Sequence, residues 1–111
     1  MAELNPGDVI WAFLDPTAGR EQSGRRPVVV VSGTAHLMLA DTLVAVVPVT
    51  SVDRGWSNHV PLHEIGLPRD SWAMTEQIRT VSRERIADRI GRIDPWTLRA
   101  IRGWISDFLD L

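Results

Sequence analysis

Arg26 is the residue whose type and position are best suited to bind a phosphate group or to stabilise charge on it. It stands directly before Pro27 and a run of valines, and proline, whose φ is fixed, pins the start of that run. A guanidinium held there could bind a phosphate bidentately or stabilise transition-state charge. An arginine that merely ends a strand and points to water fits the same position. A shift of one residue in strand phase would exchange Arg26 with its neighbour Arg25.

Two other groups of residues are candidate sites. His59 and His63 are four residues apart, next to Glu64, a spacing that puts metal ligands on one face of a helix. Pro61 lies between them and argues against a helix, so we expect no metal and no cofactor. Among the five tryptophans, which could stack on bases, Trp56 is the best candidate for exposure, and most of the others suit a core or dimer interface.

The elements that must position these residues are mostly strands. β-branched and aromatic runs predict strands at Asp8–Leu14, Pro27–Ser32, Leu43–Thr50, Gly55–Leu62, Ser71–Met74, Glu76–Ser82 and Ala87–Ile93. The unbroken valines of the second run predict burial on both faces. Gly33–Asp41 is expected to connect two strands, with a short helical turn. Asp94 as N-cap, Pro95 and apolar residues at steps of three and four predict a helix over Asp94–Leu109. The pattern favours a small barrel or sandwich closed by that helix.

Composition narrows the class of protein. The 111 residues predict a single domain over 1–111. With no cysteine, disulfides and cysteine-based zinc sites are excluded. The net charge of −2 argues mildly against a nucleic-acid binder, although all twelve basic residues are arginine. No signal peptide and no apolar run long enough to span a bilayer is visible, so a cytoplasmic protein without membrane contact is expected.

A longer pattern surrounds Arg26. The chain reads Gly-Asp-Val-Ile-Trp at 7–11, Asp-Pro-Thr at 15–17, and Gly-Arg-Glu-Gln-Ser-Gly-Arg-Arg-Pro at 19–27, followed by the valines. Val-Pro-Val-Thr-Ser at 47–51, Glu-Gln-Ile-Arg-Thr at 76–80 and Asp-Arg-Ile-Gly at 88–91 follow in order. Over nearly the whole chain this sequence resembles the MazF/PemK family of endoribonuclease toxins.

The resemblance implies a fold, an activity and partners. The fold is a mainly β protein with a C-terminal helix, an SH3-like small β-barrel of the MazF/CcdB/Kid type. The activity is metal-independent cleavage of single-stranded RNA at a specific sequence, leaving a 2′,3′-cyclic phosphate and a 5′-hydroxyl. The partners are a second copy of the chain, with RNA bound along the dimer interface, and a MazE-like antitoxin whose acidic, disordered C-terminal tail fills that groove.

The resemblance also assigns residue roles. Arg26 and Thr50 are the catalytic residues it implies, although a threonine at a strand end is also ordinary β structure. Seven further residues are implied or favoured as RNA contacts, namely Glu21, Gln22, Arg25, Ser51, Trp56, Glu76 and Gln77. Since arginine is effectively never deprotonated, the general acid and base stay open, and Glu21 is one candidate.

Two other functions remain as alternatives. A CcdB-like gyrase poison would share the fold, but such chains end in a Trp-Gly-Ile type tail, whereas this one ends Phe-Leu-Asp-Leu. A non-catalytic SH3-like RNA-binding module is the second. The recognised RNA sequence depends on the loops around 21–25, 52–58 and 65–70, whose shapes the sequence does not predict.

Overall fold

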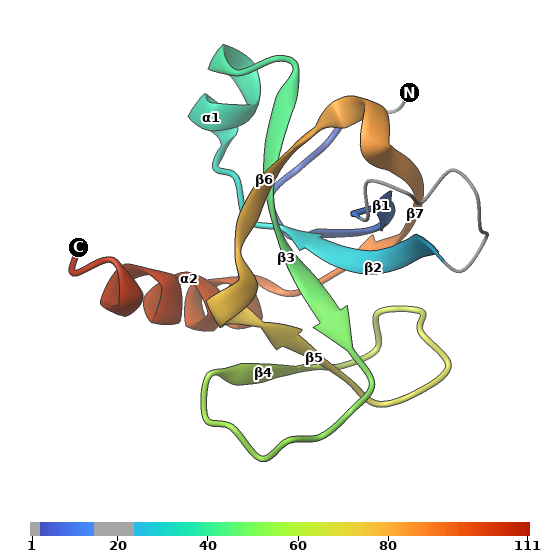
Figure 1. Ribbon diagram of the computed structural model, residues 1–111, viewed down its shortest axis with the longest axis vertical. Coiled ribbons are helices and arrows are strands. Elements are labelled where there is room, and N and C mark those ends of the chain that lie inside the picture. The colour runs from blue at the N-terminus through green and yellow to red at the C-terminus, as the bar shows by residue number, and fades with distance from the viewer. Residues whose placement is uncertain (1–2, 15–23) are drawn as a thin grey trace.

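The computed structural model describes residues 3–14 and 24–111. Within these residues, seven strands, two α-helices and two short 3-10 helices follow one another (Figure 1). In order they are β1 (Asp8–Phe13), β2 (Arg25–Val30), α1 (Thr34–Leu39), β3 (Leu43–Thr50), β4 (His59–Leu62), β5 (Ser71–Met74), η3 (Thr75–Gln77), β6 (Arg79–Ser82), η4 (Arg83–Arg85), β7 (Ile86–Arg92) and α2 (Pro95–Phe108).

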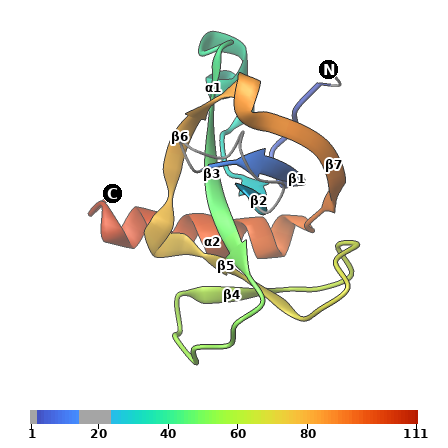
Figure 2. The same cartoon turned by 45° about the vertical axis from the view of Figure 1, so that its right-hand side comes forward.

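The central strand of the sheet is β3. The strand order is β4-β5-β3-β2-β1-β7, every pairing is antiparallel, and β6 pairs with the first half of β3. The sheet curls strongly, and α2 crosses its lower half (Figure 2). A mainly β fold with a C-terminal helix is therefore confirmed. No pairing among the described strands joins the two ends of the sheet, so "barrel" describes its curl and not a closed ring.

The valine run divides two hydrophobic clusters. Val28 and Val30 belong to one cluster, while Val29 and Val31 belong to the other. Successive side chains of a strand point to opposite faces, so β2 lies between two cores and the predicted burial on both faces is confirmed. One cluster contains Ile101 and Ile105 of α2, and the other contains Leu37 of α1.

The C-terminal helix starts where the sequence predicts. The Asp94 carboxylate accepts a hydrogen bond from the Thr97 amide at 2.8 Å, and Pro95 occupies the first turn. Arg102 then donates to the carbonyl oxygen of Val31 at 3.0 Å, which ties the helix to the end of β2. Capping and burial of one apolar face together explain this element.

Several predicted strand boundaries are wrong. Glu76 and Gln77 lie in η3, and the strand starts only at Arg79. The buried Thr75 hydroxyl donates to the Asn58 carbonyl at 2.8 Å, which holds the chain in a tight turn there. Likewise β4 starts at His59 and not at Gly55, because the Asp53 carboxylate accepts from the Gly55 amide and Gly55 has a φ of +71°. Smaller shifts move β2 to Arg25–Val30 and β7 to Ile86–Arg92.

Candidate active site

An open cleft of about 300 Å³ lies at the carboxyl end of β3. Over its carboxyl half β3 is flanked by β2 and β5, and both run antiparallel to it. Each of them therefore begins where β3 ends. The residues that line the cleft come from these three strands, from the two residues after β3 and from the segment before β5, namely Arg25, Arg26, Pro27, Val49, Thr50, Ser51, Val52, Leu67, Pro68, Arg69 and Ser71. Four sequence-predicted site residues, Arg25, Arg26, Thr50 and Ser51, are thus together.

Thr50 is the buried member of this group. It is 9% exposed, and its hydroxyl oxygen accepts a hydrogen bond from the Val52 amide at 3.1 Å. A hydroxyl also carries one donor. No described residue accepts that proton, so the hydroxyl can donate to a ligand in the cleft. Ser51 is exposed beside it.

The two arginines of β2 are both exposed at its start. Arg26 pairs with Ala12 across the sheet, and Arg25 pairs with Phe13. The Arg25 guanidinium lies 4.5 Å from the ring centroid of Trp11, a cation–π arrangement that restrains it. Arg26 forms no ion pair with any described residue. It is therefore the less restrained of the two cations.

Arg69 is a third arginine on the cleft, and sequence reasoning did not name it. It lies in the segment between β4 and β5, together with Leu67 and Pro68 of the lining. Ser71, at the start of β5, donates from its hydroxyl to the Arg69 carbonyl at 2.9 Å. The sequence marks residues 65–70 only as a groove-lining loop. Which of them faces the cleft depends on how β5 pairs with β3.

The cleft has a positive character that the whole chain lacks. Three guanidinium groups and three hydroxyl groups line it, and no carboxylate of the described residues does. Since the net charge of the chain is −2, the positive charge of the cleft comes from where its arginines lie and not from an overall excess of basic residues. Such a surface favours a polyanion.

A second polar cluster lies at the start of β4. The Nε2 atom of His59 is 3.0 and 3.1 Å from the two carboxylate oxygens of Glu76, and the Asn58 side chain donates to the same carboxylate at 2.8 Å. The His59 side chain is 2% exposed, and its Nδ1 atom has no hydrogen-bond partner among the residues that the structure describes. These contacts use the Glu76 carboxylate to join η3 to the segment before β4.

The environment of Glu76 changes its acidity. Partial burial raises the pKa of the carboxyl, but hydrogen bonds from His59 and from the Glu76 backbone oppose this, together with the charge of His59. The net effect is a pKa below the usual value of 4.5. Glu76 is therefore ionised at neutral pH and stabilised in that form.

Trp56, Glu76 and Gln77 do not line the cleft with Arg26 and Thr50. The Trp56 ring is tilted against the His59 ring at 4.8 Å and is 52% exposed, so its predicted exposure is confirmed. Trp96, on α2, is more exposed still, at 73%. The Gln77 amide donates to Glu76 at 3.4 Å. The predicted contacts Glu21 and Gln22 lie outside the described residues.

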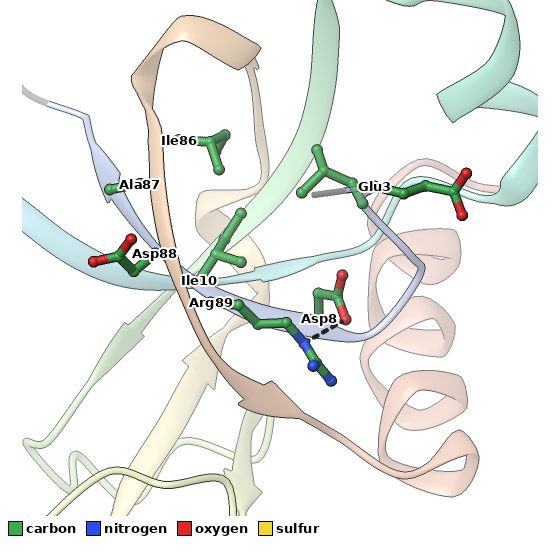
Figure 3. A pocket seen from close by; sticks show the side chains of 8 residues that line it. Glu3, Asp8, Ile10, Ile86, Ala87, Asp88 and Arg89 are labelled. Atoms are coloured by element: carbon green, nitrogen blue, oxygen red, sulfur yellow. Dashed lines mark hydrogen bonds and ion pairs between the residues drawn. The ribbon is translucent and has the colours of Figure 1, made fainter. Parts of the chain in front are cut away.

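A larger cavity, of about 330 Å³, is lined by none of the predicted site residues. Figure 3 shows it between the N-terminal segment, β1 and β7. Asp8 is 1% exposed there, and its carboxylate accepts from Arg89 at 3.2 Å and from Arg92 at 3.0 Å. These two ion pairs join β1 to β7 and are structural.

Neither a metal cluster nor a membrane-spanning helix is found in the described part of the chain. No group of three or more histidine, aspartate or glutamate side chains is placed to hold a metal ion. Neither of the α-helices that the structure describes is long and apolar enough to cross a membrane.

Comparison with known proteins identifies the family of this chain. Residues 5–109 match the family of PemK-like, MazF-like toxins of type II toxin–antitoxin systems. The chain belongs to this toxin family. It is 35% identical to the endoribonuclease toxin MazF of Escherichia coli over 101 residues, which cover 90% of this chain and 88% of that protein. It is also 35% identical to the endoribonuclease MazF9 of Mycobacterium tuberculosis over 115 residues, covering 97% and 98%.

Solved structures of MazF proteins share the toxin's fold. A MazE–MazF complex from Deinococcus radiodurans superposes with a TM-score of 0.83 at 27% identity, covering 100% of this chain and 99% of that one. MazF alone from the same organism gives the same score. The family and its endoribonuclease relatives favour the toxin interpretation over a gyrase poison or a non-catalytic binding module.

Proposed function

We propose that this toxin is an endoribonuclease that cuts single-stranded RNA at a specific sequence without a metal ion or cofactor. One observation carries the proposal. Arg26 and Thr50 are 24 positions apart in the sequence, and they line the same cleft because β2 and β3 are neighbouring strands. A guanidinium and a hydroxyl that share a cleft can bind the oxygens of one phosphate group.

In the proposed reaction, the RNA 2′-oxygen attacks the adjacent phosphorus and the bond from phosphorus to the 5′-oxygen breaks. The 2′-hydroxyl loses its proton to a base, the leaving 5′-oxygen gains one from an acid, and the phosphate becomes a 2′,3′-cyclic diester. Arg26 stabilises the charge on the pentacovalent phosphorus, and the Thr50 hydroxyl donates to a non-bridging oxygen. Arg25 and Ser51 hold the RNA at the same cleft.

The proton transfers need a group beyond the described lining of the cleft. Arginine is effectively never deprotonated, and no carboxylate or imidazole of the described residues lines the cleft. We assign the base to Glu21, the nearest carboxylate in sequence before Arg26. Gln22 is proposed as an RNA contact in the same segment.

The second cluster is proposed to bind RNA away from the bond that is cut. The exposed Trp56 ring offers a face for base stacking, and the Gln77 amide has donors that can read a base edge. Glu76 is held by His59 and Asn58. We therefore propose that it contacts RNA with the lone pairs that these bonds leave available, and that it fixes the segment carrying Trp56.

The toxin is proposed to act in the cytoplasm as a single-domain chain that forms a homodimer. Its expected antitoxin is a MazE-like protein with an acidic, disordered C-terminal tail. Such a tail is complementary in charge to a cleft with three guanidinium groups. The Deinococcus structure that shares this fold is itself a complex of MazE with MazF.

Cleavage of a long mixed-sequence RNA tests the function. The purified toxin is incubated with the RNA in EDTA, beside Arg26→Ala, and the product ends are mapped. We expect cuts at one short recurring sequence by the wild type alone, with cyclic phosphates at the ends. An Arg99→Ala variant, altered on the exposed face of α2, should cut normally. No cleavage by the folded wild type would contradict the proposal and favour a gyrase poison or a binding module.

A further inference from the structure

Arg69 stands across the cleft from the two arginines of β2. The cleft lies at the carboxyl end of β3, with the start of β2 on one side and the start of β5 on the other. Arg25 and Arg26 come from the β2 side, and Arg69 comes from the segment that leads into β5. A strand of RNA in this cleft would therefore meet guanidinium groups on both sides of Thr50.

The Arg69 guanidinium is available for a ligand. Arg69 is exposed, and its guanidinium forms no hydrogen bond or ion pair with any described residue. Its backbone is held by the Ser71 hydroxyl, which donates to the Arg69 carbonyl at 2.9 Å. By contrast, eight other arginines donate hydrogen bonds to another residue or lie over an aromatic ring, namely Arg25, Arg54, Arg83, Arg85, Arg89, Arg92, Arg99 and Arg102.

The segment that carries Arg69 is fixed to the edge strand β7. Ile65 is 5% exposed and belongs to the hydrophobic core. Its carbonyl oxygen lies 2.5 Å from where a Cβ atom of Gly91 would be, so only glycine permits this approach. At Gly66, which has a φ of +90°, a Cβ atom would lie 3.0 Å from the Ile90 carbonyl oxygen. Two glycines, one from each element, therefore let the segment pack directly on β7.

We propose that Arg69 is a further RNA-binding residue of this cleft, which binds a backbone phosphate next to the one that is cut. This inference rests on the function proposed above. Arg69 sets the position of the RNA strand, while Arg26 and Thr50 act on the phosphate that reacts. Guanidinium is well suited to this task because it binds phosphate bidentately. Loss of Arg69 should weaken binding and leave the chemical step nearly unchanged.

The test uses a short single-stranded RNA that spans a mapped cleavage site, with the attacking 2′-hydroxyl replaced by hydrogen. This RNA binds and is not cut, so Kd can be measured by fluorescence anisotropy as a function of salt. Arg69→Gln should bind roughly tenfold more weakly at low salt. The slope of log Kd against log salt should fall by about 0.7, the value for one phosphate contact on a single strand. Arg99→Gln makes the same charge change on α2 and should leave the slope unchanged.

Single-turnover cleavage of the natural RNA at saturating protein separates position from chemistry. We expect Arg69→Gln to keep the wild-type rate within about threefold, whereas Arg26→Ala loses the reaction. Arg69→Lys should recover the salt slope because it retains the charge. An unchanged slope in Arg69→Gln would overturn the inference, and so would normal binding with a lost single-turnover rate. If the wild type neither binds nor cuts RNA, the proposed function fails as well.

Discussion

Replacement of Gly91 by alanine tests the packing on which the cleft depends. The added Cβ atom would lie 2.5 Å from the Ile65 carbonyl oxygen and 3.1 Å from its carbon. Both contacts are backbone atoms, which no side-chain rotation can relieve. To restore an ordinary separation of about 3.5 Å, the segment before β5 must move away from β7 by about 1 Å. Overpacking of this kind costs about 1 to 3 kcal/mol.

Thermal unfolding measures this cost directly. At about 4 °C per kcal/mol for a chain of this size, Gly91→Ala should lower Tm by about 4 to 12 °C. Gly103→Ala is the matched control, because it adds the same methyl group in α2 where no atom lies within 4 Å. Alanine is the better helix former by up to about 1 kcal/mol, so this variant should raise Tm.

A functional readout accompanies the stability change. If the displaced segment takes Arg69 with it, folded Gly91→Ala should bind the uncleavable RNA more weakly and with a smaller salt slope. A Gly91→Ala toxin as stable as the wild type would refute the close approach of Ile65 to β7. A destabilised variant with unaltered RNA binding would refute the link from this packing to the cleft.

Three further outcomes are expected. Asp8→Ala should destabilise the toxin by about 1 to 3 kcal/mol in urea unfolding. The cost stays below that of leaving a buried charge unpaired, because the side chains of Arg89 and Arg92 are 53% and 48% exposed and can be hydrated. A loss of stability near zero would refute the ion pairs. Thr50→Val should slow RNA cleavage roughly 100-fold, as for loss of one hydrogen-bond donor to the transition state, while circular dichroism shows that the variant is folded. An unchanged cleavage rate would exclude a catalytic role for the Thr50 hydroxyl. The pKa of Glu76 is lowered on folding, so the stability that its ionised carboxylate contributes is complete above the usual carboxyl pKa and is lost as pH falls through the lowered value. Glu76→Gln should therefore reduce stability more at neutral pH than at a pH well below the usual carboxyl pKa of 4.5. An equal loss at both pH values would contradict this.

The fold was predictable where local signals and burial agree. The valine run from Val28 to Val31 has no polar residue to mark a solvent face, and the structure places it between two cores. Asp94 and Pro95 favour the start of a helix through their residue types alone, independently of any tertiary contact. These two features predicted the central layer and the helix that covers it.

The errors arose where side chains of distant residues hold the backbone. The stretch Glu76–Gln77 has no local feature that argues against a strand. The turn there is held by the Thr75 hydroxyl, which donates to the carbonyl of Asn58, 17 positions away. For the same reason, the sequence did not predict that Arg69 lines the cleft. Its place on the cleft follows from the pairing of β5 with β3 and from the contact of Ile65 with Gly91, neither of which leaves a pattern in the sequence.

The arrangement of charge explains how a chain of net charge −2 can offer a surface to RNA. Antiparallel pairing brings the starts of β2 and β5 to the end of β3. β2 starts with Arg25 and Arg26, and Arg69 lies in the segment that leads into β5. Two other arginines, Arg89 and Arg92, are paired with the buried Asp8 on the edge of the sheet where β1 meets β7. Asp8 therefore neutralises cations that hold the fold together, while the described lining of the cleft contains cations and no carboxylate. Net charge is a poor guide to such a protein, because the pairing of strands decides which arginines remain available.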